Sequence, residues 1–239
     1  MASGNFVDLG AGRRGYLSVP EGAGPYPAVL VYQEAFGVNA YVQGEADRLA
    51  ANGYAALAPD LFDGETFGYD EWQKLAPKFG SLNDPKLLEY VDASLAFLDA
   101  HESVAHDGYG AFGFCMGGRL TFLSALERPK KFKAIASFYG GGIGPDEPSF
   151  GRPILIGRGG EIEASVLLLY GAEDEGITPK EHARIVETLS AAKVEFGLFV
   201  YPGAGHGFAS VDRVPSYEPV AAEKAWAEAL ALFGRTLKA

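Results

Sequence analysis

The chain of 239 residues contains a single cysteine, Cys115. One cysteine cannot form an internal disulfide and cannot by itself build a thiolate zinc site, so both kinds of stabilisation are excluded. The four histidines lack metal-ligand spacing, and the sequence has no GxxxxGK(S/T) phosphate loop and no glycine fingerprint in the context of a dinucleotide site. We therefore expect the protein to use no cofactor and no metal ion.

Basic residues and long apolar runs are also scarce. The chain has 20 Lys and Arg against 31 Asp and Glu, a formal net charge of -11, and such a surface repels nucleic-acid phosphates and anionic lipid headgroups. No apolar run is long enough to span a membrane, and the start, MASGNFVDLG, has neither the charged nor the apolar region of a signal peptide. We expect a cytoplasmic location, without nucleic-acid or membrane partners.

The sequence does contain short apolar runs that alternate with segments of helical period. This pattern predicts one α/β domain over residues 1–239, with a mostly parallel sheet covered by helices on both faces. Asp84 before a proline and Thr178 before a proline are typical of helix N-caps. The predicted strands are 15–19, 27–32, 54–58, 108–114, 134–140, 164–171 and 195–203, and the predicted helices are 40–52, 84–101, 117–127, 178–191 and 217–236. The stretch 141–163 is predicted to be loop.

The stretch GFCMGG, residues 113–118, places Cys115 between two glycines, after an apolar strand and before a helical pattern. This is the GxSxG nucleophile elbow with sulfur in place of oxygen, a tight turn at which flanking side chains would collide with neighbouring elements. The N–H of Met116 and the helix dipole would favour a thiolate and a developing oxyanion. The alternative is an inert buried thiol, because free cysteines are often buried and the chain has 32 glycines.

The rest of a catalytic triad follows the cysteine in the order that this fold requires. The loop AEDEGITP offers Glu173, Asp174 and Glu175 after a predicted strand, with Asp174 in the middle, and GAGHGF places His206 after the last strand. An acidic loop can also be merely solvated. Because carboxyl ends of parallel strands meet at one edge of a sheet, we expect Cys115, Asp174 and His206 to converge there. The other histidines, His101, His106 and His182, are expected to be structural.

These motifs resemble the dienelactone hydrolase family of the α/β hydrolases. The resemblance extends over nearly the whole chain and rests on the motifs VYQEAFGVN, APDLF, GFCMGGR, SFYGGGI, LLLYGAEDEGITP and YPGAGHGF. It implies an α/β-hydrolase fold, Cys115 as the nucleophile, His206 as the base and Asp174 as its orienting acid. It further implies that Glu34 accepts a hydrogen bond from the resting thiol, and that the N–H of Ala35 joins that of Met116 in an oxyanion hole.

The family's two carboxylate-binding arginines are not at the matching positions. The stretch DGETFGYDEWQKL has no arginine, and the position four past His206 is Ser210, although Arg213 in the same loop could restore one contact. Without that pair a substrate carboxylate loses its charge-assisted anchors. We therefore expect a preference for neutral, apolar-acyl or aryl esters, held by loop aromatics. The candidates are Phe36, Trp72, Tyr139 and Phe208, with Phe62, Phe67 and Tyr69 as further possibilities, some of which are expected to belong to the core.

The function predicted from these residues is that of a carboxymethylenebutenolidase-like ester or lactone hydrolase, acting on a small molecule through an acyl-cysteine intermediate. Because a fold does not fix a function, a non-hydrolytic binding protein or a thiol redox sensor on the same scaffold is the alternative. We expect a monomer or a small homo-oligomer.

Overall fold

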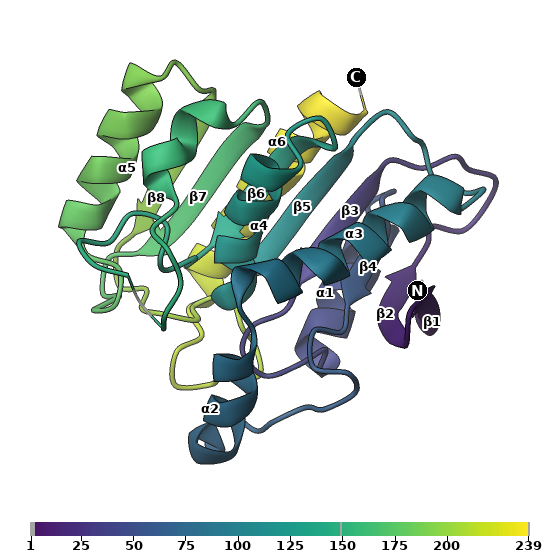
Figure 1. Ribbon diagram of the computed structural model, residues 1–239, viewed down its shortest axis with the longest axis horizontal. Helices are drawn as coiled ribbons and strands as arrows, with labels where there is room; N and C mark the ends of the chain where they lie inside the picture. The colour runs from purple at the N-terminus through teal and green to yellow at the C-terminus, as the bar shows by residue number, and fades with distance from the viewer. Residues whose placement is uncertain (1–2, 149, 239) are drawn as a thin grey trace.

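The computed structural model describes residues 3–148 and 150–238, which contain one eight-stranded sheet in the order β1-β2-β4-β3-β5-β6-β7-β8 (Figure 1). The first two strands run antiparallel to their neighbours, and all the other pairs are parallel. The mostly parallel sheet predicted from the sequence is therefore confirmed. The strands are β1 Asn5–Gly10, β2 Arg13–Ser18, β3 Ala28–Tyr32, β4 Ala55–Pro59, β5 Tyr109–Phe114, β6 Phe132–Phe138, β7 Ser165–Gly171 and β8 Phe196–Tyr201.

Helices cover both faces of the sheet, as Figure 1 shows. Helices α1 and α6 pack on one face, and α3 and α4 pack on the other. Every residue of β3 and β5 is buried between these layers, which explains their continuous apolar sequence. The helices are α1 Ala40–Ala51, α2 Trp72–Ser81, α3 Asp84–Ala100, α4 Met116–Glu127, α5 Pro179–Ala191 and α6 Pro219–Leu237, with a 3₁₀ turn, η1, at Ile156–Glu161.

Three elements were not predicted from the sequence. Strand β1 is an edge strand with mostly exposed residues, and η1 lies inside the stretch predicted to be loop. Helix α2 contains Pro77 and its first residue follows Glu71, whose side chain makes no capping hydrogen bond, so the usual signals of a helix start are missing. Figure 1 shows α2 at the lower end of the molecule, away from the two helical layers.

The N-caps of two helices can be compared with those predicted from the sequence. Thr178 caps α5 as expected, because its side chain accepts a hydrogen bond from the N–H of Glu181. The cap of α3 is Asn83, whose side chain accepts a hydrogen bond from the N–H of Lys86, and not the predicted Asp84. Asp84 instead uses its carboxylate in an ion pair with Arg119 of α4.

Among residues 3–148 and 150–238, no helix combines the length and the apolar character needed to cross a bilayer.

The turn from β5 into α4 confirms the steric argument for the elbow glycines. Cys115 has a φ of 52° and a ψ of -112°, a backbone conformation that L-residues rarely adopt. A Cβ on Gly113 would lie 2.3 Å from the carbonyl oxygen of Gly117, and a Cβ on Gly117 would lie 2.2 Å from the carbonyl oxygen of Tyr32. Both obstacles are backbone atoms, so neither glycine can be replaced without moving a strand or the helix.

We therefore predict that Gly117→Ala destabilises the protein by about 1–3 kcal/mol, the usual range for overpacking. The matched control is Gly44→Ala at an exposed position of α1, where an added Cβ meets no atom within 4 Å. That substitution should stabilise the protein by about 0.5–1 kcal/mol, because alanine has the higher helix propensity. Urea unfolding of the two variants gives the comparison, and equal effects would contradict the steric account.

Candidate active site

The candidate catalytic residues lie at the carboxyl ends of four strands. Glu34 follows β3, Cys115 follows β5, Asp174 follows β7 and His206 follows β8. Cys115 and His206 both line a cavity of about 510 Å³ at this end of the sheet. The parallel order of these strands therefore brings residues that are more than 170 positions apart in the sequence to one site.

The acid and the base of the predicted triad are in direct contact. Nδ1 of His206 lies 2.8 Å from Oδ2 of Asp174, whose side chain is almost fully buried. The other oxygen of Asp174 accepts a hydrogen bond of 2.9 Å from the N–H of Gly176, which holds the carboxylate in place. Glu173 and Glu175 are exposed, so the choice of Asp174 among the three acids agrees with the geometry.

The imidazole of His206 also interacts with Cys115. Burial opposes the charging of this ring, but the charge of Cys115 and hydrogen bonding to Asp174 and Cys115 raise the pKa of His206 to about 10. An imidazole that gains a proton beside sulfur is the partner that a nucleophilic cysteine needs. About a third of the His206 side chain, 32%, stays exposed, which leaves the ring accessible from the cavity.

Glu34 is buried, and its two carboxylate oxygens have no hydrogen bond of normal geometry among the described residues. Burial raises the pKa of the Glu34 carboxyl, while the nearby Tyr139 hydroxyl, Arg213 and His206 oppose the rise. The family resemblance implies a hydrogen bond from the thiol of Cys115 to Glu34. The structure does not contain this hydrogen bond among the described residues. Glu34 nevertheless lies close to the base of the triad.

The two candidate oxyanion-hole residues flank the cysteine. Met116 is the first residue of α4, where backbone N–H groups have no acceptor within the helix, and Ala35 lines the cavity beside Glu34. The positive end of the α4 dipole is directed to the same place. The arrangement can hold a negatively charged oxygen next to sulfur.

Not all the predicted substrate-binding aromatics reach the cavity. Phe36, Trp72 and Tyr69 line it, and Trp72 is 48% exposed at the start of α2. Tyr139 and Phe208 are fully buried and pack against each other with ring centroids 5.3 Å apart, so the structure places them in the core. The rings of Tyr139 and His206 also pack edge to face, with their centroids 5.2 Å apart. Phe62 is fully buried too, and Phe67 is partly buried against the core.

Arginine reaches the cavity although none stands at the family's two positions, and the predicted substrate-binding residue Arg213 is among the lining residues. The guanidinium-bearing residues Arg119, Arg152 and Arg213 all line it. Ser210, which stands at the family's arginine position, is fully buried and its Oγ lies 2.9 Å from the hydroxyl of Tyr69. Positive charge therefore reaches the cavity from sequence positions other than those the family uses.

Sequence reasoning missed several of these lining residues. Arg119 lies four positions after Cys115 in the quoted elbow motif, so helical spacing could have placed it beside the site. Arg152 and Phe150 belong to the stretch predicted to be loop, where no periodic pattern indicates which side chains turn inward. The described parts of the chain contain no group of three or more His, Cys, Asp or Glu side chains arranged to hold a metal ion.

Comparison with known proteins agrees with this architecture. The family model described as Dienelactone hydrolase family matches residues 13–237. A protein of Synechocystis sp. named as a carboxymethylenebutenolidase is 34% identical over 233 residues, covering 94% of this chain and 92% of its own. A Bradyrhizobium sp. protein named as a 2-oxo-3-(5-oxofuran-2-ylidene)propanoate lactonase is 30% identical, with 93% and 90% covered. The crystal structure of a Klebsiella pneumoniae protein titled as a dienelactone hydrolase superposes with a TM-score of 0.88 at 32% identity, covering 97% of this chain and 98% of the other.

The sheet order, the elbow and these structural neighbours define an α/β hydrolase. The chain belongs to the dienelactone hydrolase family. Because a lactone is a cyclic ester, this membership identifies a carboxylic ester hydrolase.

The pKa of His206 should depend on the sulfur. Because the charge of Cys115 is the largest cause that raises this pKa, we predict that Cys115→Ala lowers it from about 10. A group whose pKa is raised in the folded protein contributes its full stabilisation at pH values below its unfolded pKa, which is about 6.5 for histidine. For His206 this contribution is lost as the pH rises through about 10. The pH dependence of stability in this window should therefore shrink in the variant.

Proton NMR titration of the histidine ring signals measures the shift. His182, whose pKa burial lowers, is the internal control and should titrate as in the unaltered protein. An unchanged His206 titration in Cys115→Ala would show that sulfur and imidazole do not interact.

Proposed function

We propose that this protein hydrolyses small-molecule esters or lactones with Cys115 as the nucleophile and an acyl-cysteine intermediate. The observation that supports this best is the relay from Asp174 through His206 to Cys115, with 2.8 Å between the carboxylate and the imidazole. A protein that only binds a ligand has no need for an acid and a base aligned with its single cysteine.

The residues have distinct roles in the proposed reaction. His206 takes the proton from the sulfur of Cys115, and the thiolate attacks the carbonyl carbon of the substrate. The N–H groups of Met116 and Ala35 hold the oxyanion that forms. The intermediate collapses to a thioester, and the alcohol leaves with the proton that His206 returns. Water, deprotonated by His206, then hydrolyses the thioester and regenerates the thiol and a carboxylic acid.

The sulfur limits which substrates fit this mechanism. A thiolate is a good leaving group, so the tetrahedral intermediate expels it in preference to a poor alkoxide or an amine. Activated esters and strained lactones are therefore suitable substrates, and peptides are not. The preference for neutral esters that the sequence predicts is not part of this proposal, because three arginines line the cavity.

We predict that Cys115→Ala abolishes hydrolysis of p-nitrophenyl butyrate, and that Asp174→Asn lowers kcat about 10³- to 10⁴-fold because His206 loses its orienting acid. Release of p-nitrophenolate measures both rates. Mass spectrometry of rapidly quenched protein should show the added butyryl mass on the peptide that contains Cys115.

Two results would contradict this proposal. Equal hydrolysis by the unaltered protein and Cys115→Ala would remove the cysteine from the reaction. Absence of ester turnover together with rapid inactivation of the thiol by peroxide would favour the redox-sensor alternative. The matched control is Glu223→Gln at an exposed position of α6, which should hydrolyse at the unaltered rate.

Glu34 is proposed to disfavour the thiolate in the resting protein, because a buried negative charge close to His206 and Arg213 competes for their positive charge. We predict that Glu34→Gln increases the rate of Cys115 alkylation by iodoacetamide at pH 7. The control is Glu45→Gln, which removes another buried carboxylate, one that accepts a hydrogen bond from Trp226. A rate that is unchanged or lower in Glu34→Gln would refute this role.

A further inference from the structure

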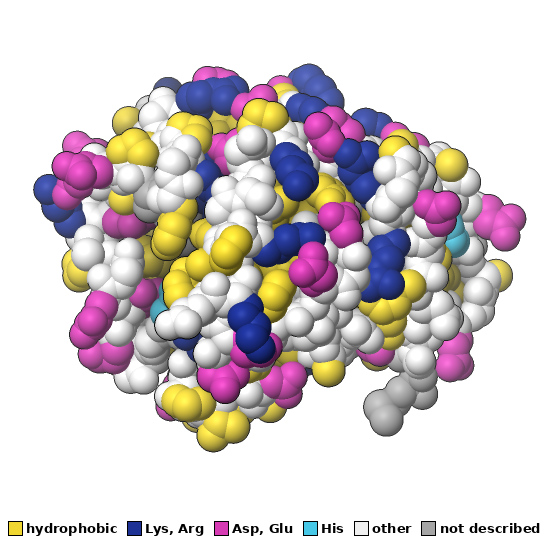
Figure 2. All heavy atoms as spheres, turned by 60° about the horizontal axis from the view of Figure 1, so that its bottom comes forward, with side chains coloured by type: hydrophobic (Ala, Val, Ile, Leu, Met, Phe, Trp, Pro, Cys, Tyr) yellow, Lys and Arg dark blue, Asp and Glu magenta, His cyan; other side chains and the backbone are white. Residues whose placement is uncertain are grey.

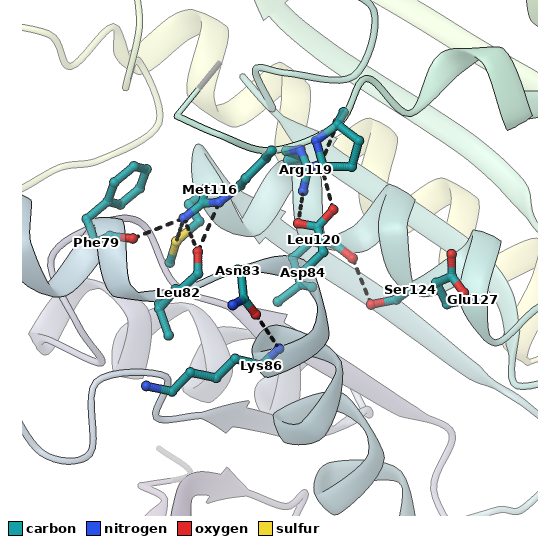
Figure 3. A network of polar contacts seen from close by, with 12 residues as sticks. Phe79, Leu82, Asn83, Asp84, Lys86, Met116, Arg119, Leu120, Ser124 and Glu127 are labelled. Atoms are coloured by element: carbon teal, nitrogen blue, oxygen red, sulfur yellow. Dashed lines mark hydrogen bonds and ion pairs between the residues drawn. The ribbon is translucent and has the colours of Figure 1, made fainter. Parts of the chain in front are cut away.

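Arg152 is a buried guanidinium in the wall of the active-site cavity. The residue is 6% exposed, lies between β6 and η1, and shares the cavity lining with Cys115 and His206. Its Nε and Nη2 donate to the carbonyl oxygen of Leu82 at 3.2 and 3.0 Å, and Nη2 also donates to the carbonyl oxygen of Phe79 at 3.1 Å. Figure 3 labels Phe79, Leu82 and Met116, the three residues whose acceptor atoms contact the Arg152 guanidinium.

These contacts explain the position of Arg152 but leave its charge unbalanced. Phe79 is in the last turn of α2 and Leu82 follows the helix, so the guanidinium caps carbonyl groups at a helix C-terminus. The acceptors that its side chain contacts among the described residues are all neutral: two carbonyls and, at 3.9 Å, the sulfur of Met116. Among the described residues no carboxylate pairs with Arg152, whereas a buried cation is ordinarily paired.

The neighbouring Arg119 differs from Arg152, because a carboxylate balances its positive charge. Arg119 makes two hydrogen bonds of 2.7 and 2.9 Å to the carboxylate of Asp84, and Figure 3 shows these two side chains facing each other. Among the described residues, the only carboxylate in the cavity lining is Glu181, which accepts a hydrogen bond from the N–H of Gly144. Arg213 also lines the cavity without an ion pair among the described residues, but it is partly exposed, so Arg152 is the buried cation of the lining whose charge no carboxylate balances.

The surroundings of Arg152 are otherwise apolar. The guanidinium lies 4.5 Å from the ring centroid of Phe79, which packs against Trp72 and Phe150, and these two side chains line the cavity. The face that Figure 2 brings forward shows hydrophobic and basic side chains interspersed near its centre. An apolar wall strengthens the attraction between a guanidinium and an anion, because few water molecules compete.

We propose that Arg152 is a specificity-determining residue that binds an anionic group, such as a carboxylate, on the substrate whose ester or lactone bond Cys115 attacks. This inference rests on the proposed function. The anchor comes from the stretch between β6 and η1, so it differs from the two loop positions at which the family resemblance places arginine. The substrate would lie with its carbonyl at Cys115 and its anionic end at Arg152, against the aromatic wall.

The test compares two esters that share the same acyl chain, of which one carries a negative charge and the other is neutral. They are mono-p-nitrophenyl adipate and its methyl ester. We predict that the unaltered protein has the higher kcat/KM for the acid. Arg152→Gln, which can still donate to the helix carbonyls, should lower kcat/KM for the acid about 10- to 100-fold, mainly through KM, as expected for a lost charged hydrogen bond. The rate with the methyl ester should change less than about threefold. Arg152→Lys should retain part of the preference.

Other outcomes would overturn the assignment. Equal losses on both substrates would mean that Arg152 only caps α2, and loss of the preference in Arg213→Gln but not in Arg152→Gln would move the anchor to Arg213. No preference in the unaltered protein would refute an anion site.

A second measurement separates this inference from the proposed function and does not depend on ester turnover. The ratio of Cys115 alkylation by iodoacetate to that by iodoacetamide reports positive charge beside the sulfur. The ratio should exceed that of free cysteine and fall in Arg152→Gln. If esters are not hydrolysed but the ratio behaves as expected, the proposed reaction fails and the anion site stands. A ratio equal to that of free cysteine would refute the site even if Arg152→Gln does not fold.

Discussion

The close approach of three backbone segments at the elbow is the constraint on which the rest of the site depends. Gly117 lies so near the end of β3 that an added Cβ would be 2.2 Å from the carbonyl oxygen of Tyr32. This contact locks the start of α4 against the strand that leads to Glu34 and Ala35. The cysteine is therefore held in a strained conformation, φ 52°, by the sheet and helix themselves, and its position does not rely on flexible side chains.

The electrostatics follow from that placement. The α4 N-terminus, the imidazole of His206 and the guanidinium groups of Arg152 and Arg213 all bring positive charge to the cavity, in a protein whose net charge is -11. Positively charged groups thus gather around the cavity although the molecule as a whole is negative. Net charge describes long-range attraction, whereas chemistry at a buried site depends on the few groups that burial places around it.

The parts of this structure that could be predicted are those determined by the periodicity of hydrophobic residues and by local steric constraints. The parallel strands, α3, α4 and α5, and the order of Cys115, Asp174 and His206 all follow from apolar runs and glycine positions. The cavity walls could not be predicted in the same way. Helix α2 begins without a side-chain cap, and Arg152 lies in an aperiodic stretch whose path is decided by tertiary contacts, so neither has a local signal. Tyr139 and Phe208 show the converse error, since an aromatic residue next to a catalytic motif can equally belong to the core.

The way α2 is attached has a consequence for the shape of the cavity. This short helix lies outside the two layers that cover the sheet, and its C-terminal carbonyls are held by a single arginine from a distant loop. Leu75 and Phe79 of α2 are buried in the core, whereas Trp72 at its start is half exposed and lines the cavity. A change at Trp72 would therefore reshape the cavity wall while the strand ends that lead to Cys115, Asp174 and His206 stay as they are.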